Sequence, residues 1–256
     1  MPRFDFQPPR TSWDVGFGFR NGARGTHSSR TIMLDELSRL ATSCHLRGDV
    51  RKAILEENVL GKSTASGRTL TLQRLKELYS FDPSSPIFRV FAGLYRRDPS
   101  ALPQLALLMA MARDPLLRAS ARPIVGLAAG SELTRDALRN AIAAVVGSRM
   151  NEAVLDKVVR NTASSWTKTG HLVGRTIKRR ARIHPNPTAF AFAVWLAQKA
   201  GFSGADLFEN AWITALDIEP AAARSLAERV HAAGLITFRA IGNGFELDAT
   251  PLERLN

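Results

Sequence analysis

The spacing of apolar residues is the feature that most constrains the fold of this chain. From residue 31 to residue 234, segments with apolar residues three and four apart follow one another, separated by glycine and proline. This spacing is typical of amphipathic helices, and glycine and proline commonly end helices. Strand-like alternation occurs at "LITFRAIGNGFELD", around the turn Gly242-Asn243-Gly244. We therefore expect a mainly helical, all-α fold with a small β-hairpin near the C-terminus.

The helical segments group into four parts along the chain. Residues 1–30 carry proline, glycine, arginine and aromatic residues, which favours a flexible basic arm; an arm that packs its aromatic rings is the alternative. Residues 31–83 hold three short helices with a polar turn before the third, as in a helix-turn-helix. Residues 84–182 indicate a central helical bundle that ends in the basic connector "RTIKRRARIHPNP". Residues 183–256 give three helices and a hairpin, the order of a winged helix-turn-helix.

The charge of the chain is positive and segregated. The formal net charge is +12, and 28 of the 35 basic residues are arginine. Residues 157–182 contain eight basic residues and no acid, and residues 58–76 contain four and no acid, whereas residues 183–256 carry net charge −3. Clustered cations bind nucleic acid by releasing the counterions of its phosphates. The charge pattern therefore predicts a polyanionic partner, with double-stranded DNA as the simplest one.

Two groups of side chains are the candidate DNA contacts. At the start of the third helix, where we expect Ser66 to cap it, the candidates are Lys62, Ser63, Ser66, Arg68 and, further along, Arg74. In the second acid-free stretch the candidates are Lys168, Arg175, Lys178, Arg179, Arg180 and Arg182. The acidic C-terminal part offers Arg239 on its hairpin, but its net charge argues against a main role in DNA contact.

Other classes of site find little support in the sequence. The motif Gly61-Lys62-Ser63 ends like a nucleotide-binding P-loop, but that loop needs a glycine where Glu56 stands and a strand where the sequence favours a helix. The five histidines are scattered and there is one cysteine, so we expect no metal site, no cofactor and no catalytic residues. No apolar run reaches the roughly 18 residues of a membrane span. We expect a cytoplasmic protein.

Three segments resemble those of a known family. They are "TIMLDELSRL" with "ILEENVLGKSTASGRTLTLQRLKEL", then "LPQLALLMAMARDPLLR", and then "LDKVVRNTASSWTKTGHLVG". In this order they resemble the A component of BREX anti-phage defence systems (BrxA-like proteins). The resemblance implies an all-helical, non-enzymatic DNA-binding protein, with helix-turn-helix modules around a core similar to the NusB antitermination factor. It also implies a methyltransferase, an ATPase and a phosphatase-like protein as candidate partners.

Three functional hypotheses follow from the sequence. The first is a non-enzymatic DNA-binding component of a BREX-type system that grips duplex DNA mainly through its phosphates. The second is an RNA-binding factor of the antitermination type, suggested by the NusB-like core. The third is a subunit for protein assembly, whose basic stretches only keep it in solution.

Overall fold

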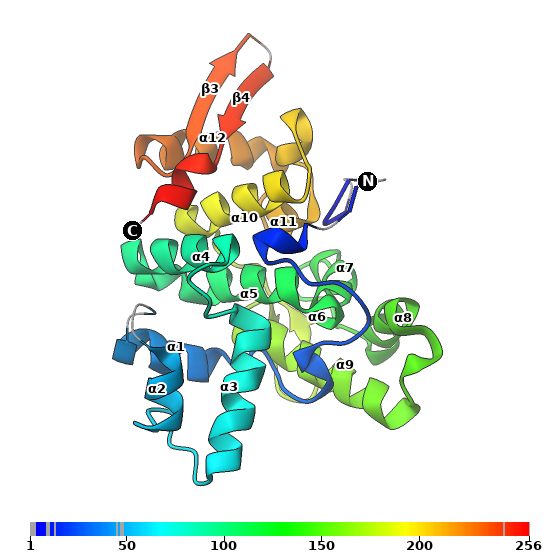
Figure 1. Cartoon of the computed structure of the whole chain (residues 1–256). Coiled ribbons are helices and arrows are strands. Elements are labelled where there is room, and N and C mark those ends of the chain that lie inside the picture. The colour runs from blue at the N-terminus through cyan, green and yellow to red at the C-terminus, as the bar shows by residue number, and fades with distance from the viewer. Residues whose placement is uncertain are drawn as a thin grey trace.

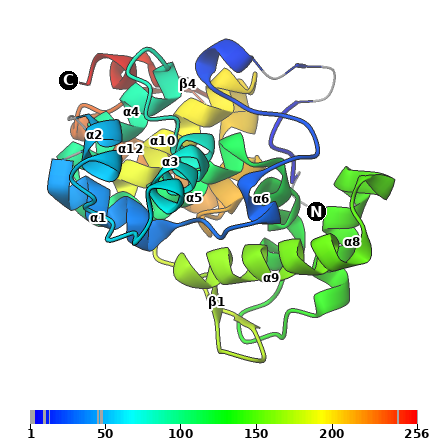
Figure 2. The same cartoon turned by 60° about the horizontal axis from the view of Figure 1, so that its bottom comes forward.

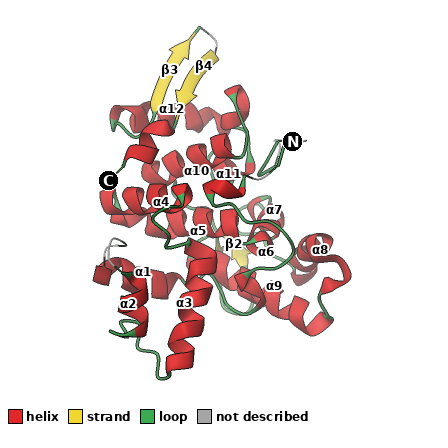
Figure 3. Ribbon diagram, viewed as in Figure 1, coloured by secondary structure: helices red, strands yellow, loops and turns green. Residues whose placement is uncertain are grey.

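The computed structural model describes residues 4–8, 11–12, 14–44, 46, 49–242 and 244–255. It confirms a mainly helical chain and adds a second small antiparallel hairpin to the predicted one (Figures 1 and 3). The α-helices are α1 (Leu34–Cys44), α2 (Val50–Leu55), α3 (Ala65–Tyr79), α4 (Pro86–Arg97), α5 (Leu102–Arg113), α6 (Pro115–Ala119), α7 (Ala121–Val125), α8 (Arg135–Val146), α9 (Glu152–Lys168), α10 (Pro187–Lys199), α11 (Ala211–Thr214) and α12 (Pro220–Ala232). The 3₁₀ turns are η1 (Val15–Phe17), η2 (Thr26–Ser28), η3 (Pro99–Ala101), η4 (Gly147–Arg149), η5 (Gly204–Leu207) and η6 (Thr250–Arg254).

Two helices that are apolar nearly all round form the centre of the molecule. Helix α5 contacts α1, α3, α4 and α10, and α10 contacts α4, α11 and α12 in turn. Nearly all of the residues of both helices are buried, because no face of either is polar enough to lie against water. Helix α10 belongs to the part predicted as a C-terminal domain, so one apolar core continues across the predicted boundary after residue 182.

The N-terminal helices pack as the apolar spacing predicts, with differences at their ends. The predicted stripe at Ile32, Leu37 and Leu40 is buried. Helix α2 ends at Leu55, although the sequence favours helix up to residue 60. Residues 56–60 lie instead in the turn before α3, where Asn58 and Gly61 have positive φ angles. The cap of α3 is Thr64, whose Oγ1 accepts the Gly67 N–H at 3.0 Å. The prediction of Ser66 as the cap is therefore wrong, since Ser66 lies in the first turn of the helix.

The described part of the N-terminal segment is attached to the body of the protein and does not form a free arm. Phe19 and His27 are buried. The Ala211 N–H donates to the Asp5 carbonyl at 2.9 Å, and the Trp212 indole N–H donates to the Phe6 carbonyl at 2.8 Å. Phe6 and Phe19 pack against Trp212 of α11, which agrees with the alternative of an arm that packs its aromatic rings.

The basic connector forms the hairpin that the sequence did not predict. Strand β1 (Leu172–Val173) pairs antiparallel with β2 (Arg179–Arg180). The segment before α8 joins them, since the Arg180 N–H donates to the Ser131 carbonyl and the Leu133 N–H donates to the Lys178 carbonyl, each at 2.8 Å. Two-residue strands are too short to give a recognisable alternation.

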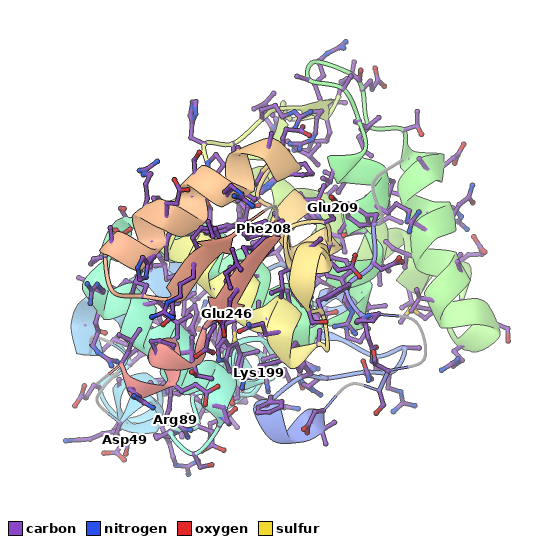
Figure 4. All side chains as sticks on the ribbon, turned by 90° about the horizontal axis from the view of Figure 1, so that it is seen from above. Asp49, Arg89, Lys199, Phe208, Glu209 and Glu246 are labelled. Atoms are coloured by element: carbon purple, nitrogen blue, oxygen red, sulfur yellow. The ribbon has the colours of Figure 1, made fainter. Side chains whose placement is uncertain are left out.

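The predicted C-terminal hairpin is confirmed. Strands β3 (Thr237–Ile241) and β4 (Gly244–Asp248) pair in the expected antiparallel register. Phe208 stacks on Phe245 of β4 with ring centroids 4.4 Å apart, so the hairpin lies over η5 (Figure 4). Residues 204–218, where the sequence favours the second of the three C-terminal helices, form the turn η5 followed by the four-residue α11. Asn210 separates the two and caps α11.

Candidate nucleic-acid interface

The turn before α3 exposes part of the first predicted group. Ser63 and Ser66 are exposed, and Arg68 is half-buried without an ion pair among the described residues. The Lys62 ammonium lies 3.2 Å from a carboxylate oxygen of Glu36 in the first turn of α1. Three of the five predicted side chains thus remain available to a phosphate, whereas Lys62 and Arg74 are paired with acids.

The first turn of α1 also neutralises Lys168, the last residue of α9. Its ammonium forms an ion pair with Asp35, next to the Glu36 that holds Lys62. Both acids lie at a helix N-terminus, where negative charge is favourable. Because surface ion pairs exchange partners at little cost, Lys168 still adds to the local positive potential, but less than its sequence position suggested.

Arg180 is the clearest correction to the predicted site. Its side chain is fully buried, and its guanidinium forms an ion pair and hydrogen bond with Asp217, which is 2% exposed. The same guanidinium donates to the carbonyl of His171 at 3.4 Å. A phosphate on the surface cannot reach this group, so Arg180 is a structural residue and not a DNA contact.

The other basic residues of the connector are on the surface and differ in how many hydrogen bonds and ion pairs they form. Arg182 lies 3.4 Å from Asp217 and 3.5 Å from Glu219, so its charge is shared with two acids. Arg179 donates to the carbonyl of Gly130 at 3.2 Å, and Lys178 donates to that of Gly174 at 2.6 Å. Arg175 is exposed and has no hydrogen bond or ion pair among the described residues. Arg175 is therefore the freest cation of the predicted group.

The hairpin, α8 and α9 enclose a cleft of about 520 Å³, which we call the basic cleft. Its unpaired cations are Arg160 of α9 and Arg175 of the hairpin, and Lys178 lines it as well. Glu132 is its acidic lining residue. The cleft also has hydroxyl groups, from Ser164 and Thr176 among others.

Arg160 was not among the predicted contacts, although it lies in the acid-free stretch 157–182. It is one of four polar residues spaced three and four apart along α9, an arrangement that places them on one helix face. We call this face the α9 stripe; it consists of Lys157, Arg160, Ser164 and Lys168. Figure 2 brings α9 forward, with α8 beside one end and the β1–β2 hairpin beside the other.

The acid of α9 that lies one turn before Arg160 is already paired. Asp156 lies 2.8 Å from the guanidinium of Arg135 and 2.6 Å from that of Arg139. The hydrogen bond from Arg135 is the main cause of a pKa of Asp156 below its usual value. This carboxylate is thus ionised and paired with Arg135 and Arg139. The charge of Arg160 also lowers the pKa of Asp156, so Asp156 offsets part of the charge of Arg160.

A second cavity, of about 830 Å³, lies where the N-terminal segment meets α3 and η4. Four arginines line it: Arg20, Arg24, Arg74 and Arg149. Of these, Arg74 was named as a candidate DNA contact from the sequence. The guanidinium of Arg74 forms an ion pair with a carboxylate oxygen of Glu77 at 2.8 Å, in the same cavity and on the same helix, so the charge of Arg74 is largely neutralised. Arg24 and Arg149 are exposed and have no ion pair among the described residues. The arginine content of residues 1–30 was the signal for Arg20 and Arg24.

Arg239 lies apart from the other predicted residues. It is exposed on β3, opposite Glu246 of β4. Figure 1 places this hairpin at the other end of the molecule from α3 and α9. The structure therefore does not bring Arg239 into the same surface as the basic cleft.

One buried cluster has the order of contacts of a serine-histidine-aspartate triad. His27 Nδ1 lies 2.8 Å from Asp114 Oδ2, and His27 Nε2 lies 2.8 Å from Ser165 Oγ. All three residues are buried, and Ser165 Oγ also accepts the Ile32 N–H and donates to the Asn161 carbonyl. Asp114 caps α6 through the Leu116 N–H. The cluster therefore ties the N-terminal segment to α6 and α9.

No group of three metal-ligating side chains occurs within the described residues. Among the helices of this described part, none combines the length and the apolar character that crossing a membrane requires. Comparison of the chain with protein-family models, with curated proteins and with solved structures gives no match.

Proposed function

We propose that this protein binds duplex DNA, mainly through phosphate contacts made by the α9 stripe and the basic cleft. The observation that carries the proposal is the convergence of Arg160 and Arg175, from a helix and a hairpin, on one cleft. Neither forms an ion pair among the described residues, although Glu132 also lines the cleft. Arginine at such a position serves phosphate well, because its planar fork donates two parallel hydrogen bonds. Ser164 and Thr176 add hydroxyl donors beside it.

The position of the charge supports a polyanion rather than a solubilising role. Several of the other cations of the predicted groups are already paired, as Lys62, Lys168 and Arg182 are. Arg160 and Arg175 have no ion pair among the described residues and lie in the same cleft. Other cations without an ion pair among these residues, such as Arg68, Arg149 and Arg239, lie elsewhere on the surface. A duplex carries about one charge per 1.7 Å of its axis, so a line of cations along a helix gains most from such a ligand.

Two finer parts of the proposal concern the ends of the molecule. The first is that α1–α3 form a helix-turn-helix in which Ser63, Ser66 and Arg68 add phosphate contacts at the start of α3. The second is that α10 to β4 form a winged helix whose surface is used for protein contact, consistent with the net charge of −3 over residues 183–256.

The test is a salt series with the whole protein and a 25-base-pair duplex labelled with fluorescein, followed by anisotropy. We expect binding at low salt and a linear fall of log K with log salt concentration, with a slope of about −0.9 for each phosphate contact. Competition with unlabelled duplex DNA and with a structured RNA decides between the two nucleic acids. Stronger competition by RNA would favour the antitermination-type hypothesis, and the absence of any binding would favour an assembly subunit.

We further propose that the protein acts as a non-enzymatic, cytoplasmic component of a BREX-type phage-defence system. The resemblance of the three sequence segments supports this part, and the methyltransferase, ATPase and phosphatase-like protein of such a system are the expected partners. Affinity purification of the tagged protein from its own host would test it. Recovery of none of these partners, together with no change in phage plating after deletion of the gene, would contradict it.

A further inference from the structure

We propose that the tip of the β1–β2 hairpin is a wedge that places Val173 and Ile177 in a groove of the bound duplex and disturbs the stacking of a base step. This inference rests on the proposed function. It adds a second mode of contact, apolar and directed at the bases, to the phosphate contacts of the basic cleft.

The first observation is that the hairpin exposes large apolar side chains. Val173 is 51% exposed and Ile177 is 52% exposed. The neighbouring Leu172 and its cross-strand partner Arg180 are buried, so the opposite face of the hairpin carries Val173 and its partner Arg179 toward solvent. Ile177 lines the rim of the basic cleft. Few other large apolar side chains of the described residues are as exposed.

The second observation is that the hairpin is firmly held. Its strands are bonded to the segment before α8 at Ser131 and Leu133, and its inner face is tied to Asp217 through Arg180. The turn is tight: a Cβ on Gly174 would lie 2.1 Å from the Ile177 carbonyl oxygen, and Gly174 has a φ of 98°. A wedge has to keep its shape while it separates base pairs, and this anchoring provides that stiffness.

The third observation is the charge around the tip, which selects the partner. Arg175, Lys178 and Arg179 are close in sequence to the two apolar residues, and residues 157–182 contain no acid. Glu132, which forms a β-bridge with Arg179 and lines the cleft, is the acid beside them. Proteins that kink DNA from the minor groove use this combination, with cations on the phosphates and an apolar side chain between two base steps. A lipid surface would also attract cations and apolar groups. However, Arg175 and Lys178 line a concave cleft, which suits a rounded duplex backbone better than a flat bilayer.

The test uses 25-base-pair duplexes that carry 2-aminopurine at successive positions, bound by the full-length protein. Unstacking of 2-aminopurine raises its fluorescence, so we expect a several-fold increase at one step with the unchanged protein. The variant Val173→Ser/Ile177→Ser is expected to lose most of this increase, with the salt slope of its affinity unchanged. Ile177→Ser alone leaves both strands intact, because Ile177 lies outside them. The matched control, Val145→Ser/Ile241→Ser, removes two exposed apolar residues elsewhere and should behave as the unchanged protein.

Each outcome decides between the two proposals. Binding without any fluorescence change, or a change that survives both hairpin variants, overturns the wedge and leaves the phosphate interface standing. No binding to the duplex by the unchanged protein overturns both. Vesicles of phosphatidylcholine with phosphatidylserine form a parallel arm. Binding to these vesicles that depends on Val173 and Ile177, with no effect on DNA, would show that the tip serves a membrane instead.

Discussion

The buried ion pair between Arg180 and Asp217 predicts that Arg180 contributes to stability, whereas the nearby exposed Arg175 contributes to DNA binding. Arg180 has no exposed surface, and Asp217 retains 2%. Removing one partner from such a pair costs about 3–5 kcal/mol, because the other charge stays buried without compensation. In the variant Arg180→Met, Asp217 keeps the Ile183 N–H at 2.8 Å and Arg182 at 3.4 Å. In Asp217→Asn, Arg180 keeps only neutral acceptors, so we expect this variant to lie at the upper end of the range.

The assay is urea unfolding followed by the intrinsic tryptophan fluorescence of the chain, to which the buried Trp166, Trp195 and Trp212 contribute. Trp166 lies against His171 with ring centroids 4.8 Å apart. The double variant should lose less than the sum of the two single variants, by at least about 1 kcal/mol, since the residues are in contact. Arg175→Met is the matched surface control and should change stability by less than about 0.5 kcal/mol. A loss below about 1 kcal/mol for Asp217→Asn would refute the structural role of the pair. So would a loss of DNA affinity in Arg180→Met, at equal folded fraction, as large as in Arg175→Met.

Three further predictions concern stability. Thr64→Ala removes the cap of α3 and should cost about 1 kcal/mol in urea unfolding, whereas Ser66→Ala should cost less than half of that. Tyr79→Phe leaves the buried Ile32 carbonyl without its 2.5 Å hydrogen bond and should cost about 1–3 kcal/mol by the same assay. Burial lowers the pKa of His171 from 6.5 to about 4, so between these values the unfolded chain binds a proton that the native chain does not. The free energy of unfolding should therefore fall by up to about 3 kcal/mol as the pH drops from 6.5 to 4. A pH series should show this slope in the unchanged protein and in exposed-site His184→Gln, but not in His171→Gln.

The helical core was largely predictable because its signal is local. Helix α5 is apolar on every side, and a segment of that kind has to be buried whatever surrounds it. The hairpin at Gly242 and Gly244 was predictable for the same reason, since its turn residues are adjacent to the alternating strands. The β1–β2 hairpin was not, because it depends on bonds to Ser131 and Leu133, more than forty residues earlier in the chain.

The sequence predicted which stretch of the chain carries the candidate site, but it did not predict which single residues of that stretch are free to bind a ligand. A run such as Arg179-Arg180 shows that charge is present, but alternate residues of a strand point to opposite faces, and one of the two is buried. Lys62 and Lys168 are neutralised by Glu36 and Asp35, which are distant in sequence, so no local pattern reveals the pairing. Arg160 was missed because its importance comes from the hairpin folded beside it.

The central claim is that the cations of the α9 stripe and the basic cleft form the DNA-binding surface. The most direct measurement is the duplex affinity of Arg160→Glu/Arg175→Glu compared with that of Arg229→Glu/Arg254→Glu, which changes the net charge equally at exposed positions outside this surface. We expect the first variant to lose at least tenfold in affinity and its slope of log K against log salt to become shallower by about 2. We expect the second variant to lose much less. Equal losses in the two variants would contradict the account, because net charge alone would then explain the binding.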